Sequence, residues 1–124
     1  MENKTTVLVA DDCEPTFNLL RTILERAGFR VVGARTAMEA LEKAIEELPQ
    51  LILMDVNLAE GNGMAAARML REDPAASAIP IIAMSSISPF DLRDQAKAAG
   101  CDEYLAKPFK MADLAWRIQK VMKS

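Results

Sequence analysis

The sequence predicts an α/β fold, in which five parallel strands form a doubly wound sheet in the order 2-1-3-4-5. The first observation is that short apolar runs alternate along the chain with longer segments of helical periodicity. The second is that several of these runs are almost continuously apolar, as expected for parallel strands covered by helices on both faces. The third is that the connections are short, which favours right-handed crossovers between successive strands.

Each expected strand is a short run rich in branched apolar residues. The five runs are VLVA (7–10), RVVGA (30–34), LILM (51–54), PIIAM (80–84) and EYLA (103–106). Branched apolar side chains pack well on a pleated surface, so these runs favour strands over helices of the same length. Their even distribution between helical segments predicts one sheet in one domain.

The helical segments show apolar residues at helical spacing and recognisable ends. The first is expected to start near Glu14-Pro15, to bury Phe17, Leu20, Leu24 and Ala27, and to end at Gly28. The second covers 37–48, the third runs from Gly63 to Arg71, the fourth from Ser88 (N-cap) and Pro89 to Gly100, and the fifth from Met111 to Lys123. With the strands, these helices complete five βα units.

Length and composition indicate one globular domain. The 124 residues are 51% apolar and 27% charged, which is typical of a soluble protein, and we expect a single domain over 1–124 with a core at about 6–122. The net charge of −3 argues against nucleic acid as a direct partner. The apolar runs are much shorter than the roughly 20 residues of a membrane-spanning helix.

Cysteine and histidine usage excludes further classes. Cys13 and Cys101 are the only thiols, and the N-terminus does not look like a signal peptide, so we expect a cytoplasmic protein without a disulfide framework. Histidine is absent, which removes the commonest general base and the commonest zinc ligand.

Three aspartates follow two strands that are neighbours in the predicted order. Asp11 and Asp12 come directly after the first strand and Asp55 after the third, so all three carboxylates should meet at the carboxyl edge of the sheet. Two adjacent carboxylates near a core repel each other, and a cation would relieve that repulsion. Several carboxylates are the composition of a Mg²⁺ site, to which the carbonyl of Asn57 could add a ligand.

The last two strands deliver further polar groups to the same edge, Ser85 after the fourth and Lys107 after the fifth. An aspartate in such a site can attack a phosphoryl group, provided that cations neutralise the phosphoryl oxygens. Asp55 is the expected acceptor, because the adjacent aspartates are occupied with metal. Ser85 would donate a hydrogen bond to one phosphoryl oxygen, and Lys107 would pair with another.

Five segments at these spacings resemble the receiver domain of two-component response regulators, in its stand-alone CheY-like form. They are VLVADD (7–12), LILMDVNL (51–58), Gly63, IIAMS (81–85) and EYLAKPF (103–109). The resemblance covers almost the whole chain and implies a flavodoxin-like (βα)5 sandwich. It also implies a phosphorylation-dependent switch rather than an enzyme, although receivers promote their own phosphotransfer and autodephosphorylation.

The resemblance implies a role for each matching residue. Asp11 and Asp12 become the metal-binding pair, Asp55 the phosphoacceptor, Ser85 the hydroxyl switch, Tyr104 the aromatic switch and Lys107 the invariant lysine, with a cis bond before Pro108. The donors would be histidine kinases or phosphotransfer proteins. The output surface would comprise the fourth helix, fifth strand and fifth helix, including Tyr104 and Trp116, in a monomer or a phosphorylation-dependent dimer. Ala59 departs from the family, which usually has proline there.

Several alternatives remain open at this point. Asp11 and Asp12 could merely cap the first helix. The chain could be a pseudo-receiver that is never phosphorylated, or a phosphatase of the haloacid dehalogenase type, although Asn57 stands where such an enzyme needs an acid. Trp116 falls opposite the apolar face of its helix and could either mark a binding surface or lie against the lysine stems of the same helix.

Overall fold

The computed structural model describes residues 5–58, 60–86 and 89–122, so Ala59 and the expected N-cap Ser88 lie outside the described residues. Strands and helices alternate along the chain. The strands are β1 (Thr6–Ala10), β2 (Arg30–Ala34), β3 (Leu51–Asp55), β4 (Ile81–Ser85) and β5 (Glu103–Ala106). The helices are α1 (Glu14–Arg26), α2 (Ala37–Glu47), α3 (Gly63–Glu72), α4 (Pro89–Ala98) and α5 (Met111–Met122).

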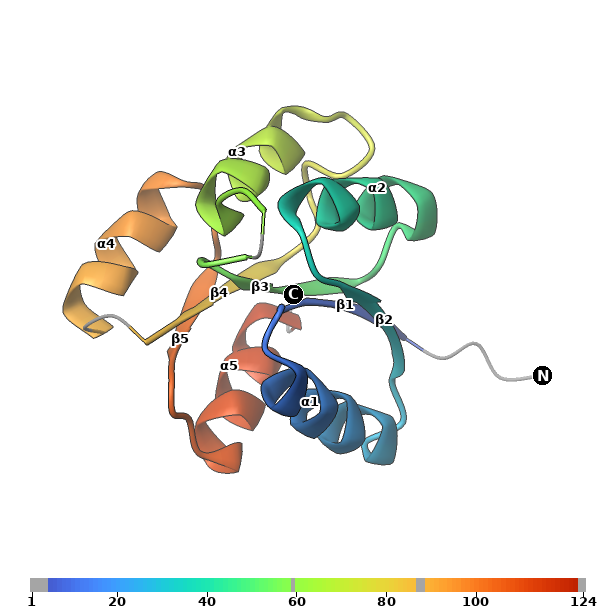
Figure 1. Ribbon diagram of the computed structural model, residues 1–124, viewed down its shortest axis with the longest axis vertical. Coiled ribbons are helices and arrows are strands. Elements are labelled where there is room, and N and C mark those ends of the chain that lie inside the picture. Colours follow the sequence, from blue (N-terminus) through green and yellow to red (C-terminus); the bar gives the residue numbers. More distant parts are fainter. Residues whose placement is uncertain (1–4, 59, 87–88, 123–124) are drawn as a thin grey trace.

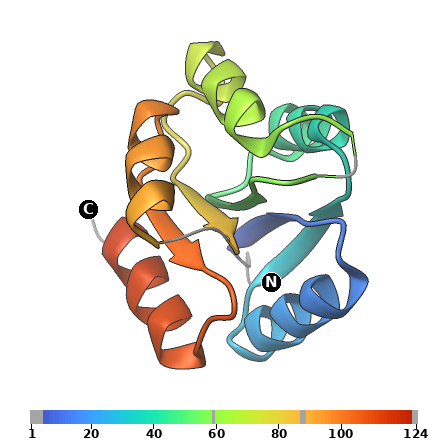
Figure 2. The same ribbon diagram turned by 60° about the vertical axis from the view of Figure 1, so that its left-hand side comes forward.

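The strands form one parallel sheet in the order β2-β1-β3-β4-β5, which confirms the predicted fold class. Helices α1 and α5 cover one face, and α2, α3 and α4 cover the other (Figure 1). Figure 2 shows β5 with α4 and α5 on either side of it. Because β5 is the last strand in the order, α4 and α5 flank an open edge of the sheet.

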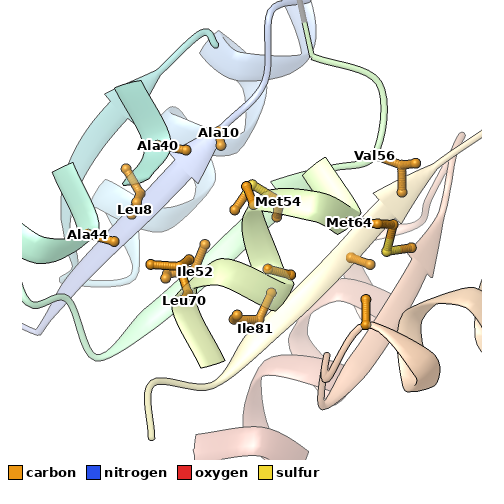
Figure 3. Packing of buried hydrophobic residues seen from close by; sticks show 14 of the residues in the cluster. Leu8, Ala10, Ala40, Ala44, Ile52, Met54, Val56, Met64, Leu70 and Ile81 are labelled. Carbon is orange, nitrogen blue, oxygen red and sulfur yellow. The ribbon is translucent and has the colours of Figure 1, made fainter. Parts of the chain in front are cut away.

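Two apolar clusters hold the helices on the sheet. Consecutive residues of β1 alternate between them: Leu8 belongs to the cluster beneath α2, α3 and α4, while Val7 and Val9 belong to the cluster beneath α1 and α5. Figure 3 shows the first cluster, where Leu8, Ile52, Met54, Leu70 and Ile81 interdigitate. Both sides of β1, β3 and β4 are therefore buried, which explains why these three strands are nearly continuously apolar.

Several boundaries differ from the expectation by one or two residues. Strands β3 and β4 run one residue further than predicted and include Asp55 and Ser85. Helix α1 ends at Arg26, and Ala27 is exposed rather than buried because it forms the C-cap before Gly28, whose φ is +97°. Within the described residues, no helix has both the length and the apolar character to cross a membrane.

Candidate functional site

The carboxylates of Asp11, Asp12 and Asp55 converge at the carboxyl edge of the sheet. Asp11 directly follows β1 and Asp55 ends β3, and these two strands are neighbours in the sheet. One oxygen from each carboxylate lies within 4.8 Å of the other two. Asp11 and Asp55 are buried, and Asp12 is half-buried. The structure thus brings together the three acids singled out from the sequence.

Lys107 reaches into this acidic cluster from the end of β5. Its ammonium Nζ lies 2.9 Å from Asp11 Oδ2 and 2.7 Å from Asp55 Oδ2. The backbone N–H of Lys107 donates to the Ser85 carbonyl at 2.7 Å, and its peptide bond to Pro108 is cis, as the resemblance implies. A single cation therefore bridges the carboxylates that follow two different strands.

Burial and neighbouring charges shift the pKa values of Asp55 and Lys107. Burial raises the pKa of Asp55, and Asp11 adds to that effect, while the hydrogen bonds from Lys107 and the Asn57 N–H oppose it. Burial acts to lower the pKa of Lys107, but its hydrogen bonds to Asp55 and Asp11 outweigh burial and raise it. One ammonium faces three carboxylates, so the pocket keeps a negative charge that a further cation would balance.

The backbone around Asp55 is tightly fixed. Asp55 Oδ1 accepts a hydrogen bond from the Asn57 N–H at 2.9 Å, and the Val56 N–H donates to the Met84 carbonyl of β4 at 2.9 Å. Gly63, the first residue of α3, lies so close that an added Cβ would be 2.0 Å from the Asp55 carbonyl oxygen. Glycine at this position lets the start of α3 pack directly on the end of β3.

The aspartates after β1 do not cap α1. The N-cap is Cys13, whose side chain makes no capping hydrogen bond, and its backbone N–H donates to Asp11 Oδ1 at 2.9 Å. This hydrogen bond fixes the Asp11 carboxylate toward Lys107 instead of toward the free N–H groups of the helix. The capping alternative is therefore wrong, and the carboxylates remain available for a cation.

The oxygen-only composition of the cluster fits a hard divalent cation. Three carboxylates supply ligand atoms close enough to share one ion, and Mg²⁺ is held in proteins by a few carboxylates with water and phosphate oxygens. Asn57 is exposed at the same edge, next to the Asp55 strand end.

Comparison with known proteins identifies the family. Residues 7–119 match the response regulator receiver domain family. The chain belongs to this family. Its curated relatives include the polar-differentiation response regulator DivK of Brucella ovis, 31% identical over 106 residues that make up 86% of each chain.

Solved receiver structures share the fold closely. A putative response regulator from Chloroflexus aurantiacus superposes with a TM-score of 0.93 at 27% identity, covering 98% of this chain and 100% of that chain. The receiver domain of sensor histidine kinase PA1611 from Pseudomonas aeruginosa has a TM-score of 0.90 at 29% identity with the same coverage, and that structure has a magnesium ion coordinated in its active site cleft. Receiver domains are signalling proteins of two-component systems that interact with histidine kinases or phosphotransfer proteins.

Two further receiver residues lie on adjacent strands beside the pocket. Ser85 ends β4 and is buried, with 1% of its surface exposed. Tyr104 lies opposite Ala83 in β5 and packs, half-buried, against the cluster beneath α2, α3 and α4. The residue paired with Ser85 in the register is Ala106, immediately before Lys107. The switch candidates are thus one strand apart at the side of the sheet nearest α4.

Trp116 of this receiver is exposed on α5, with 53% of its surface accessible. The Lys120 Nζ lies 4.8 Å from the centroid of its ring, so the indole does lie against a lysine of its own helix. Sequence reasoning missed two residues of this region, Glu103 and Arg117, which form a short ion pair. A glutamate at the start of a buried strand was the available signal, because a buried carboxylate requires a cationic partner.

Proposed function

We propose that this receiver is a phosphorylation-controlled switch in which Asp55 accepts a phosphoryl group from a histidine kinase or a histidine phosphotransfer protein. The observation that supports it most directly is the half-buried ammonium of Lys107, 2.7 Å from Asp55 and 2.9 Å from Asp11. This lysine is held in the pocket by hydrogen bonds to both carboxylates. It is well placed to pair with anionic oxygens bound beside Asp55.

The chemistry of the transfer needs few protein groups. An oxygen of the Asp55 carboxylate attacks phosphorus, the bond from phosphorus to the donor nitrogen breaks, and the donor imidazole leaves with the electron pair. Asp55 Oδ1 is oriented by the Asn57 N–H, which leaves the carboxylate fixed while the donor approaches. Lys107 then pairs with one phosphoryl oxygen, and the Ser85 hydroxyl donates to another.

Asp11, Asp12 and Asp55 would hold Mg²⁺, with the Asn57 carbonyl as an additional ligand. The closeness of the three carboxylates supports this assignment, and the magnesium ion in the PA1611 receiver is consistent with it. When bound, Mg²⁺ supplies positive charge to the phosphoryl oxygens. Asp11 and Asp55 currently share their Oδ2 atoms with Lys107, so Lys107 must exchange carboxylate contacts for phosphoryl contacts as the site fills.

The signal would leave through α4, β5 and α5. Drawing Ser85 toward a phosphoryl group vacates space beside β4, and Tyr104 is positioned on the adjacent strand to fill it. The result is a shift between two arrangements of one fold, limited to the few kcal/mol by which phosphoryl contacts differ between them. Trp116 lies on the adjoining helix and would belong to the altered surface.

The remaining assignments follow from this role. The chain acts as a single receiver domain that promotes its own phosphotransfer and autodephosphorylation, in the cytoplasm, as a monomer or a phosphorylation-dependent dimer. Direct binding to nucleic acid or membrane is not part of the proposal. The family match favours this reading over a haloacid dehalogenase phosphatase, and phosphorylation itself separates it from a pseudo-receiver.

The test is incubation with acetyl phosphate and Mg²⁺, followed by intact mass measurement. We expect one phosphate adduct on the wild type and none on Asp55→Asn. Asp94→Asn, which changes an exposed aspartate of α4, is the matched control and should keep the adduct. An undiminished adduct on Asp55→Asn would reject Asp55 as acceptor, and no adduct on the wild type would favour the pseudo-receiver.

A further inference from the structure

The guanidinium of Arg117 lies across the open edge of the sheet, between two aromatic rings. Its Cζ is 4.4 Å from the centroid of the Tyr104 ring and 5.3 Å from that of the Trp116 ring. Helix α5 lies beside the edge strand β5 (Figure 2). The Arg117 side chain of α5 reaches past this strand to Tyr104, which packs on the α4 side of the sheet. Arg117 therefore contacts Tyr104, the aromatic switch candidate, at the open edge of the sheet, whereas β4 and Ser85 lie on the other side of β5.

Two carboxylates hold the guanidinium in this place. Nη1 lies 2.5 Å from Glu103 Oε1, and Nε lies 3.1 Å from Asp113 Oδ1. The Glu103 side chain is only 6% exposed, so it strongly requires its cationic partner. Glu103 Oε1 also accepts the backbone N–H of Tyr104 at 3.2 Å. The arginine, its carboxylate anchor and the backbone of Tyr104 thus form one connected cluster.

We propose that Arg117 is a positioning residue for Tyr104: it holds the half-buried tyrosine ring at the open edge of the sheet and thereby biases the unphosphorylated receiver toward its resting arrangement. This inference rests on the proposed function, in which Tyr104 moves inward after phosphorylation. When the ring moves, Arg117 stays with Glu103 and Asp113, because neither carboxylate is attached to the ring. The arginine–aromatic contact therefore exists only in the resting arrangement and stabilises it selectively.

Thermodynamic linkage turns this bias into a measurable affinity. A contact that stabilises the resting arrangement weakens every ligand that favours the active one, and removing the contact strengthens that ligand by the same factor. A contact of this kind corresponds to about a two- to fivefold change in affinity, equivalent to about 0.4–1 kcal/mol. Loss of Arg117 should thus tighten binding at a pocket that Arg117 does not touch.

The experiment measures the apparent Kd for beryllofluoride, which mimics an aspartyl phosphate, in the presence of saturating Mg²⁺ by isothermal titration calorimetry. We expect Arg117→Met to bind about two to five times more tightly than the wild type. Lys120→Met is the matched control, since Lys120 also pairs with Glu103, but its ammonium lies over the ring of Trp116, whereas Arg117 lies over the ring of Tyr104. Its Kd should equal that of the wild type, which separates the ring contact from general loss of surface charge.

A second variant is needed in case Arg117→Met unfolds the protein because it leaves the buried Glu103 carboxylate with Lys120 as its one cationic partner among the described residues. Arg117→Met combined with Glu103→Gln removes both charges of the pair and should show the same tightening. In a Tyr104→Leu background, Arg117→Met should change the Kd no further, because the ring is absent. Arg117→Lys keeps the charge without the planar stack and should fall between wild type and Arg117→Met.

Different results reject different claims. An unchanged or weaker Kd in both Arg117 variants, or the same tightening in Lys120→Met, overturns the positioning role while leaving the proposed switch intact. A tightening that persists in Tyr104→Leu shows that Arg117 acts by another route and also overturns it. A wild type that does not bind beryllofluoride overturns the proposed function, and the positioning role with it.

Discussion

At the first position of α3, any side chain larger than hydrogen meets the backbone of Asp55. The Cβ of an alanine at position 63 would lie 2.0 Å from the Asp55 carbonyl oxygen. We expect Gly63→Ala to lower the free energy of unfolding by about 1–3 kcal/mol and to weaken Mg²⁺ binding several-fold, because α3 or the end of β3 must move. Urea denaturation and a Mg²⁺ titration measure the two effects.

Gly28→Ala is the control, because it strains the backbone conformation without a steric clash, whereas Gly63→Ala creates a clash. Gly28 has φ +97° and nothing within 4 Å of an added Cβ, so alanine there is strained but meets no neighbour. It should lower stability by about 1–2 kcal/mol and leave Mg²⁺ affinity unchanged. If Gly63→Ala also left Mg²⁺ affinity unchanged, the close approach of α3 would not control the geometry of Asp55.

The sequence predicted the location of the pocket residues better than their contacts. Asp11, Asp55 and Lys107 could be brought together on paper because parallel strands end at one edge, and strand ends are visible as changes from apolar to polar residues. The bridging of two aspartates by Lys107 depends on rotamers that no pattern encodes. Glu103 and Arg117 were missed because their contact depends on how α5 packs past the edge strand.

At the scale of elements, Arg71 in the last turn of α3 joins three segments. Its guanidinium donates to the carbonyls of Gly100, Ser77 and Ile79 at 2.7, 3.0 and 2.7 Å, and it pairs with Asp102 at 2.7 Å. Arg71→Met removes these donors and leaves part-buried carbonyls unpaired. We expect a loss of about 2–4 kcal/mol in the free energy of unfolding, measured by urea denaturation.

Lysine cannot replace this arginine, because one ammonium cannot span acceptors that lie in different directions. Arg71→Lys should therefore recover less than half of the loss. Arg68→Met, which changes an exposed arginine on the same helix, should alter stability by less than about 0.5 kcal/mol. Equal effects of the changes at positions 68 and 71 would show that the hydrogen bonds of Arg71 contribute little.

Element boundaries were predictable where a local signal exists and were missed where tertiary contacts decide. Pro15 and Gly28 marked the ends of α1 within one or two residues, because both act through backbone conformation alone. Asp55 and Ser85 were expected after their strands, yet the ladder with the neighbouring strand continues through both. Strand length depends on the partner strand, which the residues themselves do not specify.

For the whole molecule, the burial of Asp55 in the acidic pocket makes the stability of the fold depend on pH. Folding brings Asp55 into a buried site beside Asp11, which raises its pKa above the ordinary value of 3.8. The Asp55 carboxyl group therefore stays protonated to a higher pH in the folded state than in the unfolded state. The contribution of Asp55 to stability without metal therefore falls as the pH rises above about 4. Lys107 behaves differently: its raised pKa stabilises the fold below 10.5, and this stabilisation is lost only above that value.

The raised pKa of Asp55 leads to a prediction about stability with and without Mg²⁺. Without metal, Asp55→Asn removes a carboxylate that is unfavourable when ionised, so at pH 7 it should be more stable than the wild type. This advantage should shrink as the pH falls from 7 toward about 4, where Asp55 of the wild type becomes protonated in the folded state. With Mg²⁺ at ten times its Kd, the wild type should gain about 1.4 kcal/mol by mass action. Asp55→Asn and Asp12→Ala should gain much less, because each lacks one of the clustered carboxylates. Thermal melting across pH, with and without millimolar Mg²⁺, measures both effects on the same variants. Equal Mg²⁺ stabilisation of all three proteins would place the cation elsewhere, whereas a metal-free Asp55→Asn protein less stable than the wild type at pH 7 would mean that pairing with Lys107 outweighs burial.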